Sequence, residues 1–152
     1  MMKLVVSVVV FSGALSAGCA AAPPARPAAS AAGLSCTHRS EAVEKSIGYC
    51  QAVRAGDVLY VSGVTADGPM DEAVPKVYTQ LRAILESHGL TFADVARENV
   101  YAVDLDAFIA QQDVRKPYYG NWLPSATWVQ VDRLFLPSHA LEVELVAHYP
   151  KR

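Results

Sequence analysis

The clearest pattern in the chain is an alternation of apolar and polar positions near its C-terminus. Successive side chains of a β-strand point to opposite faces of a sheet, so a period of two predicts a strand with two unlike faces. We therefore predict a strand over residues 141–149 with one core face and one acidic face that meets solvent or another subunit. The two sets of positions are Leu141, Val143, Leu145 and Ala147 on one face, and Glu142, Glu144 and Val146 on the other.

Upstream of this strand, the period of the apolar positions changes to that of a helix. Val74, Val77, Leu81, Ile84 and Leu85 recur at helical spacing after Asp71, and Gly89 ends the pattern after His88. Residues 91–94 resemble a capping box that begins one short turn. A second helix is expected from Ala107 to about Tyr119, capped by Asp106, with an irregular end at Pro117.

Four further β-rich segments complete the order of elements. They lie at residues 51–54, 58–63, 99–103 and 127–132. The expected order is β-β-α-β-α-β-β, which predicts an α+β fold with a mixed sheet and two helices on one face.

The first residues of the chain have the pattern of an export signal. A basic start at Lys3 precedes an apolar stretch over 4–11 and a small-residue ending, Ala17-Gly18-Cys19, that resembles a bacterial lipobox. The apolar stretch is shorter than the roughly 20 residues that span a bilayer. We expect a signal peptide over 1–18, lipidation of Cys19, an Ala/Pro-rich tether over 19–34 and a folded domain over 35–152. Secretion without lipid and a buried cytosolic segment remain alternatives.

Composition and charge narrow the classes of partner. The chain has 152 residues and a formal net charge of −2, which suits one domain and disfavours a nucleic-acid binder, because such proteins usually carry a basic face. The four histidines lack metal-ligand spacing, so no metal is expected.

Export would permit a disulfide between Cys36 and Cys50. Two free or buried thiols are the alternative.

Several segments together resemble the RidA/YjgF family, in order and with the family's spacing. They are Gly48-Tyr49-Cys50-Gln51-Ala52, Val61-Ser62-Gly63, residues 104–108, residues 124–131 and Leu141-Glu142-Val143-Glu144. The resemblance implies a chorismate-mutase-like protomer that forms a homotrimer with three clefts between subunits. It also implies hydrolysis of reactive enamines and imines to keto acids and ammonia, without metal or organic cofactor.

The same resemblance implies the residues of a site. Glu142 matches the family's acid/base Glu, and the ligand-binding matches are Tyr49, Ser62, Gly63, Gln112, Ala126 and Trp128. The family's carboxylate-binding Arg, in a Pro-Ala-Arg motif, falls on Ala126. Alanine cannot hold a carboxylate, whereas a guanidinium binds one bidentately. Arg115 and Arg133 are the basic residues near enough in sequence to replace it.

These observations leave more than one functional hypothesis. The leading one is an exported, periplasmic RidA-like protein whose cleft either hydrolyses an imine lacking a carboxylate or binds a small organic ligand. One alternative is a working enamine/imine deaminase in which Arg115 or Arg133 binds the carboxylate. The other is a non-catalytic ligand-binding or scaffold protein of the cell envelope, attached to the membrane only through Cys19.

Overall fold

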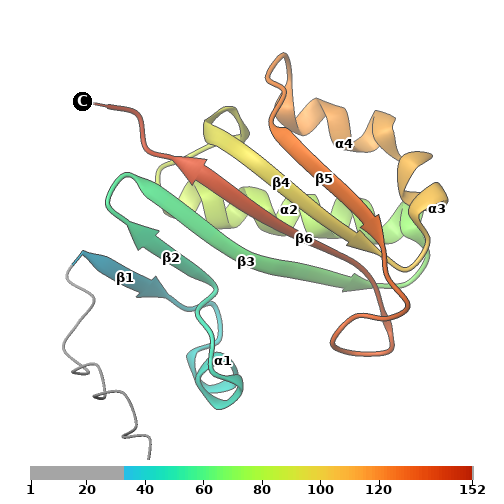
Figure 1. Cartoon of the computed structure of the whole chain (residues 1–152), viewed down its shortest axis with the longest axis horizontal. Coiled ribbons are helices and arrows are strands. Elements are labelled where there is room, and N and C mark those ends of the chain that lie inside the picture. Colours follow the sequence, from blue (N-terminus) through green and yellow to red (C-terminus); the bar gives the residue numbers. More distant parts are fainter. Residues whose placement is uncertain (1–32, 152) are drawn as a thin grey trace, which may run out of the picture.

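The fold is a six-stranded sheet with helices on one face. The computed structural model describes residues 33–151, so the expected signal peptide, Cys19 and the tether up to residue 32 lie outside the described residues. The strand order is β1-β2-β3-β6-β4-β5 (Figure 1). The strands are β1 (Leu34–Thr37), β2 (Ala52–Ala55), β3 (Val58–Asp67), β4 (Val95–Ala102), β5 (Ser125–Gln130) and β6 (His139–His148).

The last strand of the chain is central in the sheet. β6 pairs antiparallel with β3 on one side and with β4 on the other, and β5 adds in parallel beyond β4. The predicted alternation is confirmed: Leu141, Val143, Leu145 and Ala147 are at most 1% exposed. Glu142 and Glu144 alternate with these residues and lie on the other face, which no helix among residues 33–151 covers, and we call this the open face of the sheet.

The helix-covered face of the sheet carries the core. The long helix α2 (Met70–Ser87) packs against β3 and β6, and its buried positions include Val74, Val77, Leu81 and Leu85. The one-turn helix η1 (Phe92–Asp94) starts with the expected capping box at Thr91. No helix among residues 33–151 is long and apolar enough to cross a membrane.

The second predicted helix is wrong in its boundaries. It is two short helices, α3 (Leu105–Ile109) and α4 (Gln112–Tyr119), separated by Ala110 and Gln111. Asp104, and not Asp106, caps the first of them, because its side chain accepts a hydrogen bond from the backbone N–H of Ala107 at 2.9 Å. Pro117 is accommodated inside α4.

The N-terminal part of the domain contains two elements that the pattern did not predict. Strand β1 begins at Leu34, the last residue of the expected tether, and pairs with β2 at the edge of the sheet. Helix α1 (Glu41–Ile47) follows and lies beside the ends of β1 and β2 (Figure 1). All four residues of β1 are exposed, so the strand has no alternation that sequence could reveal.

Candidate functional site

A pocket on the open face brings together four of the predicted site residues. Tyr49, Ser62, Gly63 and Glu142 line a pocket of about 340 Å³. The remaining lining residues are Ile47, Thr65, Phe135 and His139. We call this the Glu142 pocket. Its contributors come from the end of α1, from β3 and from the loop that enters β6, so three separate chain segments meet there.

The turn after α1 places Tyr49 at this pocket. Gly48 ends α1 with φ 95°, a left-handed conformation that glycine adopts without the penalty of a side chain. The turn directs Tyr49 towards the open face, where it is 40% exposed. The Ser62 hydroxyl donates to the Cys50 carbonyl oxygen at 2.7 Å, so β3 is fixed to the residue that follows Tyr49.

The absence of a side chain at Gly63 makes room for the Glu142 carboxyl group. A Cβ at Gly63 would lie 1.8 Å from Oε1 and 2.6 Å from Cδ of Glu142, far inside van der Waals contact. Gly63 lies at a register irregularity between β3 and β6, where the strand pairing shifts between Val61 and Val64. The glycine is therefore part of the site because it sets where the carboxyl group lies.

The surroundings of Glu142 favour its protonated form. Burial raises the pKa of Glu142, the nearby Glu144 raises it further, and His139 partly opposes the shift. Partial desolvation penalises the charged carboxylate, which is the usual way in which a carboxyl group becomes an acid/base catalyst near neutral pH. The side chain meets the first chemical requirement for proton transfer in a pocket open to a ligand.

The other three predicted ligand-binding residues lie elsewhere. Gln112, Ala126 and Trp128 line a second pocket, of about 360 Å³, together with residues of α4 and of the loop before β5. Ala126 and Trp128 share the helix-covered side of the sheet with Glu98 and Val100, their register partners on β4. Within one protomer, the two halves of the predicted site therefore lie on opposite faces of the sheet.

Arg115 lies in this second pocket, but a buried ion pair occupies its guanidinium. Its Nε donates to Oε2 of Glu98 at 3.0 Å, and Nη2 donates to the same oxygen. Burial alone would lower the pKa of Arg115, but hydrogen bonds and charge from Glu98 raise it overall. Arg133 is exposed and lines neither pocket. Neither arginine replaces the missing family residue within the described protomer.

Glu98 is the centre of a hydrogen-bond network that sequence reasoning missed. The side chain is 0% exposed and accepts from Tyr78 Oη at 2.6 Å, Tyr119 Oη at 2.7 Å and Trp128 Nε1 at 3.0 Å, besides Arg115. Trp128 also packs edge-on against Phe108. Its indole is thus a core group as well as a wall of the second pocket.

The two cysteines of the domain are joined. Cys36 on β1 and Cys50 form a disulfide, with their Cα atoms 5.6 Å apart. The free-thiol alternative does not hold in this structure. Cys36, His38 and Cys50 offer potential metal-ligand atoms within 4.8 Å of one another. A disulfide does not supply thiolate ligands, so these residues hold no metal in the oxidised form.

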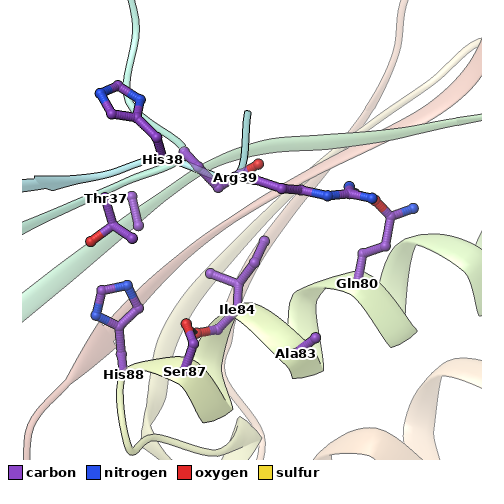
Figure 2. A pocket seen from close by; sticks show the side chains of 10 residues that line it. Thr37, His38, Arg39, Gln80, Ala83, Ile84, Ser87 and His88 are labelled. Atoms are coloured by element: carbon purple, nitrogen blue, oxygen red, sulfur yellow. Dashed lines mark hydrogen bonds between the residues drawn. The ribbon is translucent and has the colours of Figure 1, made fainter. Parts of the chain in front are cut away.

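A further cavity lies on the helix side of β1 and β2. It measures about 290 Å³, and Figure 2 shows Thr37 and Arg39 on one side and Ile84, Ser87 and His88 of the α2 end on the other. Arg39 reaches across to Gln80 on α2 through a hydrogen bond. The His38 ring points away from this cavity.

His139 is a residue of the Glu142 pocket that sequence reasoning did not select. Its Nε2 lies 3.4 Å from Thr65 Oγ1 and 3.5 Å from Asp67 Oδ1. Its Nδ1 is buried and has no hydrogen-bond partner among the described residues. The signal available in the sequence was its position three residues before Glu142, next to the start of the same strand.

Comparison with known proteins places this geometry in context. The family model described as endoribonuclease L-PSP matches residues 39–149. A RutC family protein from Pyrococcus abyssi is 32% identical over 120 residues, which cover 72% of this chain and 93% of that protein. A protein from Dermatophagoides farinae named 2-iminobutanoate/2-iminopropanoate deaminase is 28% identical, covering 64% of this chain and 83% of its own length.

Solved structures agree with these sequence matches. A member of the YjgF/YER057c/UK114 family from Mycobacterium tuberculosis superposes with a TM-score of 0.69 at 26% identity, covering 76% of this chain and 98% of the other. RidA from an Antarctic Psychrobacter gives a TM-score of 0.61 at 26% identity, covering 66% of this chain and 88% of its own.

The Glu98–Arg115 pair predicts a large loss of stability when one partner is removed. Arg115→Met should lower the free energy of unfolding by about 3–5 kcal/mol, because it leaves a buried carboxylate without its counter-charge. The Glu98→Met/Arg115→Met double variant should recover part of this loss, because it removes the unpaired charge but leaves the Tyr78 and Tyr119 hydroxyls without their acceptor. Lys116→Met, at the exposed neighbouring position, is the control and should change stability by less than about 0.5 kcal/mol. Urea unfolding measures all four proteins, and a loss below about 1 kcal/mol in Arg115→Met would contradict the pairing.

The raised pKa of Glu142 predicts a pH-dependent stability. The folded state holds this proton more tightly than the unfolded chain, so the carboxyl group destabilises the fold increasingly as pH rises above its ordinary value of 4.5. Glu142→Gln should therefore be more stable than the natural protein at pH 7 and equal to it near pH 4. Glu72→Gln is the opposite-sign control, because Lys76 lowers the pKa of Glu72. Thermal unfolding gives the Tm of each protein at both pH values. If Glu142→Gln gained as much stability over the natural protein at pH 4 as at pH 7, ionisation of Glu142 would not be the cause.

Proposed function

Because the chain belongs to the RidA/YjgF family, we propose that it hydrolyses imines or enamines that lack a carboxylate, with Glu142 as the acid/base group. The family match covers residues 39–149, and relatives at 28% identity carry the name 2-iminobutanoate/2-iminopropanoate deaminase. The observation that carries the proposal is Glu142 itself: a half-buried carboxyl group with a raised pKa at the wall of an open pocket.

The reaction needs one group that can both give and take a proton. In its acid form Glu142 protonates the imine nitrogen, which makes the imine carbon electrophilic. As a carboxylate it then accepts a proton from the water whose oxygen attacks that carbon. The carbinolamine collapses when Glu142 passes this proton to nitrogen: the C–N bond breaks, ammonia leaves, and the hydroxyl proton returns to the Glu142 carboxylate as the carbonyl forms. The sum is imine and water to carbonyl compound and ammonia. The raised pKa of Glu142, caused chiefly by burial, favours its acid form more than in an exposed glutamate and so supports this role.

The lining of the pocket supports a neutral substrate. Among its described residues there is no Lys or Arg, and the single titratable cation is the imidazole of His139. A carboxylate taken from water into this pocket would lack the charge-assisted bidentate contact that usually offsets its desolvation. Tyr49 and Phe135 supply aromatic walls instead. In this half of the site, a small, neutral, partly apolar imine fits better than an amino-acid-derived one, although the second pocket contains Lys116 and the ion-paired Arg115.

We also propose that the working cleft forms between the subunits of a homotrimer. The two halves of the site occupy different pockets of one protomer, so only a neighbouring copy can bring them together. Large exposed apolar side chains border both pockets: Leu123 is 83% exposed at one, and Phe135 is 68% exposed at the other. Such exposed apolar groups favour association. The export pattern of residues 1–19 supports a periplasmic location with an anchor at Cys19.

The trimer predicts that a charge at the border of the second pocket will dissociate it. The natural protein should have three times the protomer mass in solution, and Leu123→Asp should be monomeric because an aspartate would be desolvated at the interface. Ile109→Asp, on the exposed side of α3, is the matched control and should remain trimeric. Light scattering after size-exclusion chromatography measures the mass, and a monomeric natural protein would reject the intersubunit cleft.

The catalytic proposal predicts a substrate preference. An amine oxidase generates a neutral imine in situ, a pyridoxal-phosphate lyase generates 2-aminoacrylate, and semicarbazide trapping follows both. The natural protein should accelerate hydrolysis of the neutral imine. Glu142→Gln should lose activity by at least about 100-fold, the usual contribution of general acid–base catalysis. Gly63→Ala should lose activity to a similar extent, because its Cβ displaces the same carboxyl group.

Ala126→Arg tests whether the missing cation accounts for the substrate preference. It should raise kcat/KM for 2-aminoacrylate by about tenfold or more through a charge-assisted contact with the carboxylate. Activity of the natural protein on 2-aminoacrylate equal to that on the neutral imine would contradict the proposed class of substrate. Inactivity on both would refute catalysis and leave the ligand-binding alternative, which a shift of Tm with a bound ligand would support.

A further inference from the structure

Outside both pockets, a sulfur, an imidazole and a carboxylate lie in line beside the disulfide. Nε2 of His38 is 3.2 Å from Sγ of Cys36, and Nδ1 of the same ring is 2.7 Å from Oε2 of Glu44. We call these three side chains the Cys36 relay. A sulfur next to a base whose other nitrogen is held by an acid is the arrangement that activates cysteine in many enzymes.

The carboxylate of the relay is built into the fold. Glu44 is 2% exposed, and its Oε1 accepts from the backbone N–H groups of Arg39 and Ser40 at 3.0 and 2.8 Å. Oε2 accepts from the N–H of Gln51 at 3.2 Å as well as from His38. Burial works against ionisation, but these hydrogen bonds lower the pKa of Glu44 overall. Glu44 is thus an immobile anion that fixes the orientation of the His38 ring.

The sulfur of the relay can be reached by other molecules. Cys36 lies on the edge strand β1, whose four residues are all exposed, whereas Cys50 is half-buried. In Figure 2, the His38 ring points away from the cavity below it, in which Thr37 and His88 face each other. His38 also lines that cavity, and its Nε2 faces Sγ of Cys36 on the disulfide side of the segment.

We propose that Cys36–Cys50 is a redox-active disulfide that oxidises dithiols, with Cys36 as the exchanging sulfur and His38, held by Glu44, as the group that stabilises its thiolate. This activity is separate from imine hydrolysis and uses none of the residues that line the Glu142 pocket. A disulfide that only stabilised the fold would not require a buried anion to aim an imidazole at its exposed sulfur.

The exchange balances without any further reagent. A thiolate of the incoming dithiol attacks Sγ of Cys36, the Cys36–Cys50 bond breaks, and the electron pair leaves on Cys50, which takes a proton. In the resulting mixed disulfide, the first sulfur of the dithiol is bonded to Sγ of Cys36. The second thiolate of the dithiol then attacks that first sulfur. Cys36 departs as a thiolate that accepts a hydrogen bond from Nε2–H of His38. The dithiol loses two electrons and becomes a disulfide, and the protein becomes a dithiol.

The first test measures the equilibrium between the two protein forms. The full-length protein is incubated with reduced and oxidised glutathione at pH 7 with EDTA, since two thiolates and an imidazole would otherwise bind metal ions. Alkylation and mass measurement give the reduced fraction. His38→Ala should shift the equilibrium towards the disulfide on the order of tenfold, because the reduced form loses its stabilised thiolate. His88→Ala, the histidine on the far side of the cavity, is the control and should leave the equilibrium unchanged.

The second test asks which sulfur reacts. All variants of this test also carry Cys19→Ser, so that one cysteine remains. In Cys50→Ser, the Cys36 thiol should show thiolate absorbance at pH 7 and react rapidly with oxidised glutathione, and adding His38→Ala should abolish both. Cys36→Ser, with Cys50 remaining, should react slowly. Equal glutathione equilibria in the natural protein, His38→Ala and His88→Ala would overturn the proposal and leave a structural disulfide. Because that comparison uses proteins with both cysteines, it stands even if a single-cysteine variant fails to fold. Neither result bears on imine hydrolysis, which Glu142→Gln tests.

Discussion

The buried carboxylate of Glu98 is the constraint around which the helix-covered half of the molecule is organised. It lies in the middle of β4 with no exposure, and every group that satisfies it comes from another element: Tyr78 of α2, Arg115 and Tyr119 of α4, and Trp128 of β5. An unpaired carboxylate at this depth would be strongly destabilising, so the positions of these elements are mutually dependent. The guanidinium also stacks near the rings of Tyr119 and Trp128. Arg115 is therefore committed to the fold and cannot also act as a free carboxylate-binding group.

Two glutamates lie on opposite faces of the sheet in unlike surroundings. Glu98 is enclosed by hydrogen-bond donors on the helix-covered face, whereas Glu142, two strands away in sequence order but on the adjacent strand in space, faces the open side and is only partly desolvated. Pairs of carboxyl groups whose surroundings differ in this way usually divide into a structural anion and a proton-transfer group. Gly63 contributes to the position of Glu142, because the Glu142 carboxyl group occupies the space that a side chain at position 63 would fill.

The sequence could predict those helices and strands in which the spacing of apolar residues reflects the burial of one face of the element. The alternation along β6 and the helical period of α2 both arise from packing on one core, so they appear in the sequence. The elements β1 and α1 lack this signal, because β1 is wholly exposed and α1 buries a charged residue, Glu44, instead of an apolar stripe. The start of α3 is set by the cap at Asp104, which the sequence pattern does not distinguish from the expected cap at Asp106.

The residues of the Glu142 pocket could be predicted because the family resemblance identifies them, although they come from separate segments of the chain. Glu142, Tyr49, Ser62 and Gly63 follow from the family resemblance and meet in one pocket. The role of Arg115 on α4 depends on Glu98, which lies 17 residues earlier on β4, and the role of His38 depends on a disulfide and on the carboxylate of Glu44. Such roles arise from tertiary contacts, which cannot be inferred from the spacing of residues along the chain.

The segment that follows α1 connects the Glu142 pocket to the Cys36–Cys50 disulfide. Within four residues, Gly48 turns the chain, Tyr49 lines the Glu142 pocket, Cys50 forms the disulfide, and the backbone N–H of Gln51 binds Glu44. Ser62, another pocket residue, donates to the carbonyl of Cys50. A displacement of Cys50 on reduction would therefore act on the same backbone that positions two walls of the pocket. Any ligand whose affinity differed between the disulfide and dithiol forms would shift the redox equilibrium by the same factor, because coupling between two sites is reciprocal.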